Sequence, residues 1–139
     1  QRRALRREAA AIFRHFAADS PDRDEGPESA WRAADLYAEL GEDARALEMY
    51  RAFIDRYGGE ARGRVPDVER AYAALTRLHA QLNDYRAETR VLVEKSQQKQ
   101  LPAKTRAAAA RKARELRKDR DGRRVAVGKR GTAVLSETR

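Results

Sequence analysis

Apolar and small side chains return every three or four residues along most of this chain, which is the spacing of one face of an α-helix. Between residues 30 and 57 this spacing places Ala34 and Tyr37 on one helix, which Gly41 ends. A second helix then carries small and aromatic side chains at positions i, i+4 and i+7, namely Ala46, Tyr50 and Phe53. A small residue at 46 allows two helices to approach closely beside the aromatic rings, so this stretch predicts a helix–turn–helix unit.

The same spacing predicts a chain made of helices throughout. The expected helices cover residues 2–18, 29–40, 42–57, 66–82, 85–98 and 102–118. Prolines, glycines and the pair Asn83-Asp84 fall between them. No run of about 18 apolar residues occurs, so no membrane-spanning helix is expected. Residues 119–139 contain three glycines and short β-prone pieces, which predict an irregular basic tail, either a small hairpin or disordered.

The unit recurs along the chain with insertions. We call the helix–turn–helix unit over residues 30–57 the clear unit. Ala9, Phe13, Phe16 and Pro21 correspond to Ala46, Tyr50, Phe53 and Gly58 of the clear unit, at an offset of 37 residues (50 − 13). Leu82 follows Leu40 by 42 residues, and Leu116 follows Leu82 by 34. The extra residues fall in polar or glycine-rich loops, where insertions are tolerated.

These residues resemble the tetratricopeptide repeat, a helix–turn–helix unit of about 34 residues. The resemblance implies an all-α fold, a right-handed α-solenoid of antiparallel helix pairs. Residues 1–118 form the repeat domain, and its parts are a partial repeat over 1–21, a repeat over 29–57, a degenerate repeat over 66–98 and a further helix over 102–118. In the degenerate repeat Glu88 stands where the motif has alanine, and Lys95 where it has a large apolar residue. A generic antiparallel helical bundle is the alternative.

Residues 1–21 match the second helix of a unit without a first helix, so we expect a fragment of a longer solenoid. In a stack of repeats, a unit without its neighbour exposes apolar surface. Leu5, Ile12 and Phe13 are therefore expected to be partly exposed, or to take part in self-association through the terminal helices.

The resemblance also implies a concave groove, lined by the first helix of each unit, that binds a protein or peptide partner. By register, the groove residues of the two units are Glu28, Trp31, Asp35 and Glu39, then Arg70, Ala73, Arg77 and Gln81. An exposed tryptophan beside carboxylates is suited to anchor a partner that carries a basic and an apolar residue. The alternative is that Trp31 packs against the first helix of the chain.

Charge is divided unevenly along the sequence. The net charge is +9, and residues 100–139 hold all of it, with 13 Lys or Arg against 4 Asp or Glu. Such a segment could contact nucleic acid through phosphates, which makes a basic helical nucleic-acid-binding module the second functional hypothesis. The same residues contain no Phe, Tyr or Trp on which bases could stack, so docking on an acidic protein surface is favoured.

Residues suited to catalysis are few. The chain has no cysteine, and its two histidines, His15 and His79, lie 64 residues apart (79 − 15). No metal-binding spacing appears, so we expect no catalytic, cofactor-binding or metal-binding residues and a non-enzymatic scaffold. An inert helical segment that spaces or oligomerises a larger protein is the third hypothesis.

The end of the clear unit offers one indication of compartment. Tyr50, Phe53 and Tyr57 form the pattern Tyr-x-x-Phe-x-x-x-Tyr ahead of a glycine loop. This pattern resembles bacterial cell-envelope members of the family, such as the TolA-binding and outer-membrane assembly types. That resemblance implies a bacterial periplasmic or envelope location, with the cytoplasm as the alternative.

Overall fold

The structure, a computed structural model, describes residues 2–60 and 65–129, and these residues form helices and turns without any strand. The elements, in chain order, are α1 (Arg2–Asp19), α2 (Glu25–Glu39), α3 (Asp43–Tyr57), the short 3-10 helix η1 (Gly58–Glu60), α4 (Val65–Gln81), α5 (Tyr85–Gln97) and α6 (Ala103–Lys129). The predicted all-α class is therefore confirmed for the described residues. No helix among them is long and apolar enough to cross a membrane.

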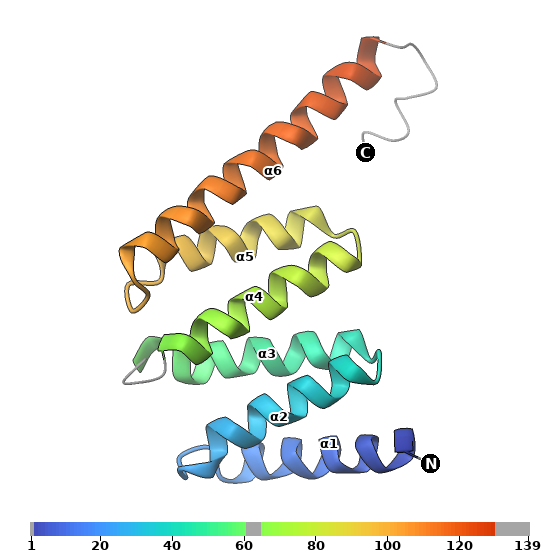
Figure 1. Ribbon diagram of the computed structural model, residues 1–139, viewed down its shortest axis with the longest axis vertical. Helices are drawn as coiled ribbons and strands as arrows, with labels where there is room; N and C mark the ends of the chain where they lie inside the picture. Colours follow the sequence, from blue (N-terminus) through green and yellow to red (C-terminus); the bar gives the residue numbers. More distant parts are fainter. Residues whose placement is uncertain (1, 61–64, 130–139) are drawn as a thin grey trace.

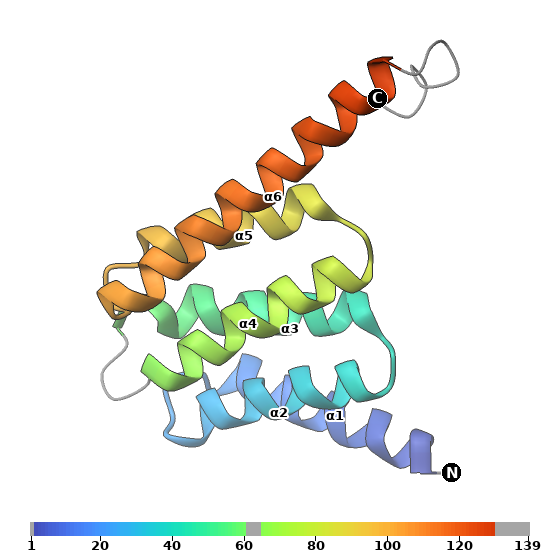
Figure 2. The same ribbon diagram turned by 45° about the horizontal axis from the view of Figure 1, so that its top comes forward.

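The six α-helices lie one upon another in chain order, with α1 at one end and α6 at the other (Figure 1). Helices α2, α4 and α6 share one tilt and lie on one side, while α1, α3 and α5 lie on the other (Figure 2). Within the described chain, each extensive contact between α-helices joins two that follow one another in sequence. Each helix is therefore held mainly by the helix before it and the helix after it.

The turns after α2 and α4 have the same geometry, 42 residues apart (83 − 41). Gly41 has a φ of 75°, and the N–H of the next residue donates to the carbonyl of Tyr37 at 2.9 Å. Asn83 has a φ of 58°, and the N–H that follows it donates to the carbonyl of His79 at 2.8 Å. Both are Schellman turns, which need a left-handed residue that glycine or asparagine provides most easily.

The small and aromatic side chains of the clear unit form the centre of the core, as the sequence predicted. Ala34, Tyr37, Ala46, Tyr50 and Phe53 are each no more than 2% exposed. They belong to one cluster of buried side chains that reaches from α1 to the segment after α5. The close approach at Ala46 is thus a packing contact between α2 and α3.

In the degenerate unit, some buried polar atoms lack a hydrogen-bond partner among the described residues, at positions where the sequence departs from the motif. Glu88 takes the place of Ala46 and is 8% exposed, and its Oε1 has no hydrogen-bond partner among the described residues. The buried Nδ1 of His79, which takes the place of Tyr37, likewise has none in this part of the chain. Burial lowers the pKa of Lys95, although the charge of Glu69 opposes this change. Buried polar groups without partners are rare because each costs free energy.

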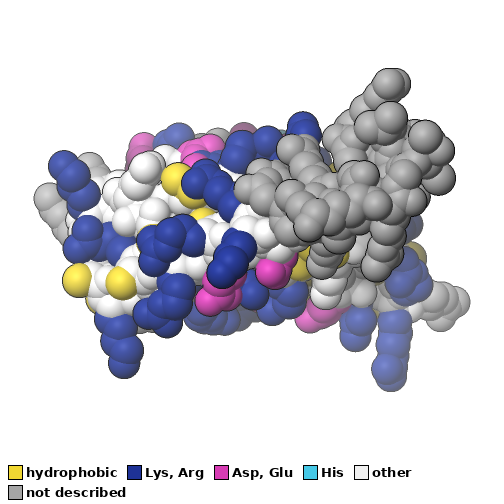
Figure 3. Space-filling view, turned by 90° about the horizontal axis from the view of Figure 1, so that it is seen from above, with side chains coloured by type: hydrophobic (Ala, Val, Ile, Leu, Met, Phe, Trp, Pro, Cys, Tyr) yellow, Lys and Arg dark blue, Asp and Glu magenta, His cyan; other side chains and the backbone are white. Residues whose placement is uncertain are grey.

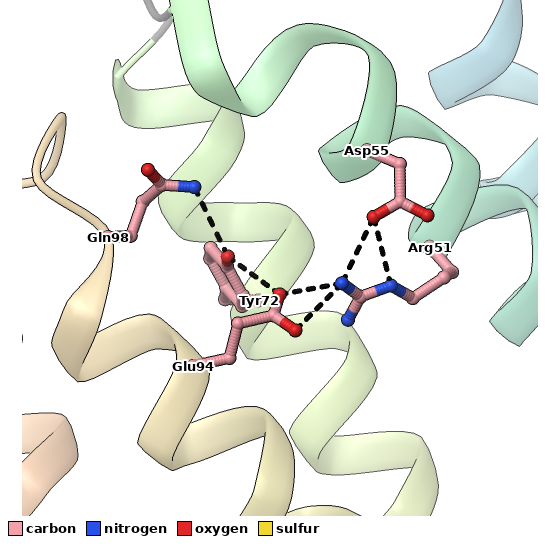
Figure 4. Close-up of polar contacts among 5 residues, drawn as sticks. All are labelled: Arg51, Asp55, Tyr72, Glu94 and Gln98. Carbon is pink, nitrogen blue, oxygen red and sulfur yellow. Dashed lines mark hydrogen bonds and ion pairs between the residues drawn. The ribbon is translucent and has the colours of Figure 1, made fainter.

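A polar cluster joins α3, α4 and α5 (Figure 4). Arg51 on α3 donates from one nitrogen to both carboxylate oxygens of Glu94 on α5, at 2.8 and 2.7 Å, and also pairs with Asp55. The hydroxyl of Tyr72 on α4 donates to the same carboxylate at 2.9 Å, and the amide of Gln98 donates to that hydroxyl at 3.4 Å. The cluster therefore connects α3 and α5, which are not consecutive helices.

Two predicted boundaries are wrong. Helix α2 begins at Glu25 rather than at residue 29, because proline is tolerated in a first helical turn and Pro27 lies there. Gly26 allows the chain to enter this helix closely, since a Cβ at that position would lie 2.7 Å from the carbonyl oxygen of Pro21.

The second correction concerns the basic end. Helix α6 continues to Lys129, so the irregular tail or hairpin expected from residue 119 is wrong for residues 119–129. Two glycines cost about 1 kcal/mol each in a helix, but the Ala, Arg and Lys residues around them have strong helical propensity. The expectation for residues 130–139 lies outside the described residues.

The two terminal helices bury few large apolar side chains. Leu5 and Ile12 on α1 are 65% and 63% exposed, as predicted, while Phe13 is half-buried. At the other end, the described side chains that α6 buries are alanines, Ala109 and Ala113, which pack with Leu92 of α5. Both ends therefore contribute less apolar burial than the middle of the stack.

The shared register predicts opposite effects at two equivalent positions. Ala46→Leu should lower the free energy of unfolding by about 1–3 kcal/mol, because it overpacks the contact between α2 and α3. Glu88→Ala should raise it by about 1 kcal/mol, because it removes a buried carboxylate oxygen without a partner. Urea unfolding followed by circular dichroism measures both, with the exposed Glu8→Ala as the control. Destabilisation by Glu88→Ala, or no effect of Ala46→Leu, would show that the two positions are not equivalent.

Tyr72 predicts a loss of stability at high pH. Burial, together with its hydrogen bond to Glu94, raises the pKa of Tyr72 from 10.0 to about 12. Because the folded state favours the neutral phenol, this contribution is complete below pH 10 and is lost as the pH rises from 10 to about 12. Tyr72→Phe should make the free energy of unfolding fall less steeply across that range, whereas Tyr85→Phe at an exposed position should leave the slope as in the wild type. An unchanged slope in Tyr72→Phe would contradict the assignment.

Candidate partner-binding groove

A hollow of about 380 Å³ lies where the first halves of α2 and α4 face each other. Its lining consists of an aromatic centre with charged side chains around it, contributed by Asp24, Pro27, Glu28, Trp31, Phe53, Asp67 and Arg70. Three of the residues predicted for the groove, Glu28, Trp31 and Arg70, are thus brought together in one site.

Trp31 forms the apolar surface of the hollow. Its ring lies edge-on to Tyr50 and Phe53 of α3, with centroid distances of 5.3 and 5.6 Å. The guanidinium of Arg70 from α4 lies over the indole at 4.8 Å from its centroid. The ring contacts of Trp31 are therefore with α3 and α4, while its neighbour Arg32 lies over Phe13 of α1, at 5.7 Å from the ring centroid.

Asp35 lies one turn further along α2 and is held by the core. The hydroxyl of Tyr50 donates to Asp35 Oδ1 at 2.6 Å. Burial, then this bond, raises the pKa of Tyr50 above its ordinary range, while the charges of Arg77 and Arg70 act in the opposite direction. Both arginines of α4 are therefore near enough to the Tyr50 hydroxyl to share one electrostatic environment with Asp35.

The charged groove residues Glu28, Arg70 and Arg77 differ in the ion pairs that they form. Glu28 is exposed and pairs with Arg32 on its own helix at 3.1 Å. Arg70 is exposed and lies 3.7 Å from Asp67. Arg77 is exposed and forms no ion pair with any described residue.

The remaining predicted residues lie at the other end of α2 and α4 and are not joined to the hollow. Glu39 is exposed, and its carboxylate is 4.0 Å from Arg6 on α1. Gln81 is exposed in the last turn of α4. The structure therefore supports a charged and aromatic site at one end of the predicted groove, with Asp35 and Arg77 beside it.

Three polar groups that contribute to the site did not emerge from the sequence. Asp24 and Asp67 line the hollow, and the Tyr50 hydroxyl fixes Asp35. A signal for the last of these was present, because a tyrosine at a core position needs a hydrogen-bond partner for its hydroxyl. The two aspartates lie at helix starts, where acidic residues are common for reasons unrelated to binding.

The site provides groups for stacking and ion pairing. A half-buried indole with a guanidinium on its face and carboxylates at its rim can hold a side chain that has an apolar stem and a charged end. Within residues 2–60 and 65–129, no three His, Asp or Glu side chains are grouped so that they could hold a metal ion. His15 is exposed and lies 2.9 Å from Asp19 on the same helix.

Comparison of the chain with models of protein families, with curated proteins and with solved structures finds no match.

The cover of Trp31 by Arg70 predicts a change in the accessibility of the indole. Trp31 is the only tryptophan, so its fluorescence reports this site alone. Arg70→Ala should increase collisional quenching by acrylamide, because the guanidinium no longer covers the ring. Arg77→Ala, which removes an equal charge about two turns further along α4, should leave the quenching as in the wild type. Equal quenching in Arg70→Ala and the wild type would show that the ring is not covered in solution.

Proposed function

We propose that this chain is a non-enzymatic scaffold or adaptor whose groove along α2 and α4 binds a protein or peptide partner. In this proposal the six helices are part of a right-handed α-solenoid of antiparallel helix pairs, of the tetratricopeptide type. The chain is proposed to belong to a longer array of such pairs.

The repeat architecture is supported because the two turns with the same geometry are separated by the offset that relates the two units in the sequence. The Schellman turns at Gly41 and Asn83 are 42 residues apart, the same offset that relates Leu40 to Leu82. The positions that the motif assigns to the interior of the clear unit are each no more than 2% exposed. In a linear stack each unit packs against its neighbours, which agrees with contacts that follow chain order.

The observation that carries the binding function is the position of Trp31 in the hollow between α2 and α4. A large aromatic side chain that is partly exposed, in a hollow rimmed by charges, is the kind of residue that dominates binding energies at interfaces. The core already supplies its edge contacts to Tyr50 and Phe53, so its orientation is fixed before a partner arrives. A fixed ring loses little conformational entropy on binding.

The alternative function, nucleic-acid binding through phosphates, is favoured by the cations of α6. Exposed cations without an ion pair to any described residue are numerous there: Lys104, Arg111, Lys112, Arg114, Arg117 and Lys118. Lys and Arg outnumber Asp and Glu on the described part of the face seen from this end (Figure 3). Binding to duplex DNA that weakens steeply with salt and does not need Trp31 would favour this function.

The proposed function predicts that Trp31 dominates partner binding. Peptides selected from a displayed random library against the whole chain provide partners, and isothermal titration calorimetry gives their affinities. Trp31→Ala should weaken binding by about 2 kcal/mol, close to thirtyfold, if the ring is an anchor. Tyr85→Ala, which removes a partly exposed ring outside the groove, is the control. Peptides that bind both variants equally would place the site elsewhere.

A further inference from the structure

The register of the groove extends from α2 and α4 to α6. Ala33, Leu75 and Ala109 are separated by 42 and 34 residues, and they are 0%, 1% and 4% exposed. Each therefore faces the interior at an equivalent position of the repeat register. Thr105 of α6 donates to Glu69 of α4 at 3.3 Å, which places the first turn of α6 beside α4. Equivalent positions on the three helices can thus be compared directly.

Along two rows of equivalent positions, the side-chain charge changes from negative on α2 to positive on α4 and α6. The first row reads Glu28 on α2, Arg70 on α4 and Lys104 on α6. The second row reads Asp35, Arg77 and Arg111 in the same order. Asp35 is half-buried and the others are exposed, so all but one present their charges to solvent. A third row, Glu39, Gln81 and Glu115, does not change sign, which confines the pattern to the first two rows.

The cations of these rows are mostly uncompensated. Arg77, Lys104 and Arg111 form no ion pair within the part of the chain that the structure describes. Arg70 is the exception, because Asp67 lies 3.7 Å away and Trp31 lies under its guanidinium. The basic side of the groove therefore offers free charges over α4 and α6, and its acidic side lies over α2.

We propose that the groove binds an extended peptide segment in one orientation, with basic residues over α2 and acidic residues over α4 and α6. This inference rests on the proposed function and specifies the chemistry of its partner. An extended chain advances by about 3.3 Å per residue, so a segment of about nine residues spans about 30 Å across the groove. The matching partner is a segment of about nine residues with its opposite charges at opposite ends.

Charge of this kind selects a partner by repulsion as well as by attraction. A uniformly basic segment places like charges over α4 and α6, and a uniformly acidic one places them over α2. A segment with alternating charges has the same composition as the matching one but cannot satisfy both sides of the groove. The order of charges, rather than their number, is therefore what the groove recognises.

Fluorescent synthetic peptides of about nine residues test this inference with the whole chain. A block peptide carries three lysines at one end, an apolar centre and three glutamates at the other, and a second peptide alternates the same residues. Fluorescence anisotropy at low salt should show that the block peptide binds at least tenfold more tightly. All-lysine and all-glutamate peptides with the same apolar centre should bind more weakly than the block peptide.

Variants of the chain assign the preference to the groove. The double variant Arg77→Glu with Arg111→Glu should abolish the tenfold preference for the block peptide. The control, Arg86→Glu with Arg90→Glu, makes the same charge change at exposed positions of α5, on the other side of the stack, and should retain the preference. Circular dichroism of each variant establishes that it is folded, and the single variant Arg111→Glu replaces the double variant if that one is not.

The other outcomes overturn the charge-order inference, either alone or together with the proposed function. Equal affinity for block and alternating peptides, with both weakened by Trp31→Ala, would overturn the charge-order inference and leave the proposed function in place. Binding of no peptide, or binding that Trp31→Ala does not weaken, would overturn the proposed function as well. Duplex DNA that binds more tightly than every peptide and displaces the block peptide would favour the nucleic-acid alternative.

Discussion

The ion pair between Arg51 and Glu94 joins α3 to α5, two helices that do not follow one another in the chain. Since extensive contacts otherwise join only consecutive helices, this bridge is one of few restraints on the angle between the clear unit and the degenerate one. Tyr72 of α4 donates its hydroxyl to the same carboxylate and is thereby fixed between the two helices. On another face of α4, the guanidinium of Arg70 lies over Trp31 of α2.

The interior of the clear unit was predictable from sequence because it depends on local periodicity. A helix repeats every 3.6 residues, so Ala46, Tyr50 and Phe53 must share a face, and a glycine at 41 must end the helix before it. The end of α6 was not predictable in the same way. Its glycines and short valine-containing piece favour a break, whereas the surrounding residues favour a helix, and the difference between these two preferences is small.

The contacts between helices could not be derived from the sequence. Register places Trp31 and Arg70 on the same side of the stack, but it does not determine that the guanidinium lies over the indole. Nor does it select Glu94 as the partner of Arg51 among 22 acidic residues. Such pairs depend on the separation and rotation of whole helices, which is decided by the sum of many small packing contacts.

The small apolar side chains that α6 buries against α5 have a consequence for the order in which the helices unfold locally. Where each helix packs mainly against its neighbours in sequence, one end of the stack can unfold locally while the rest remains folded. Alanine side chains such as Ala109 and Ala113 bury little apolar surface, so we expect the amide protons of α6 and α1 to exchange with solvent water before those of the other described helices. If α6 holds the acidic end of a bound segment, the groove can release that end while α2 and α4 retain the other.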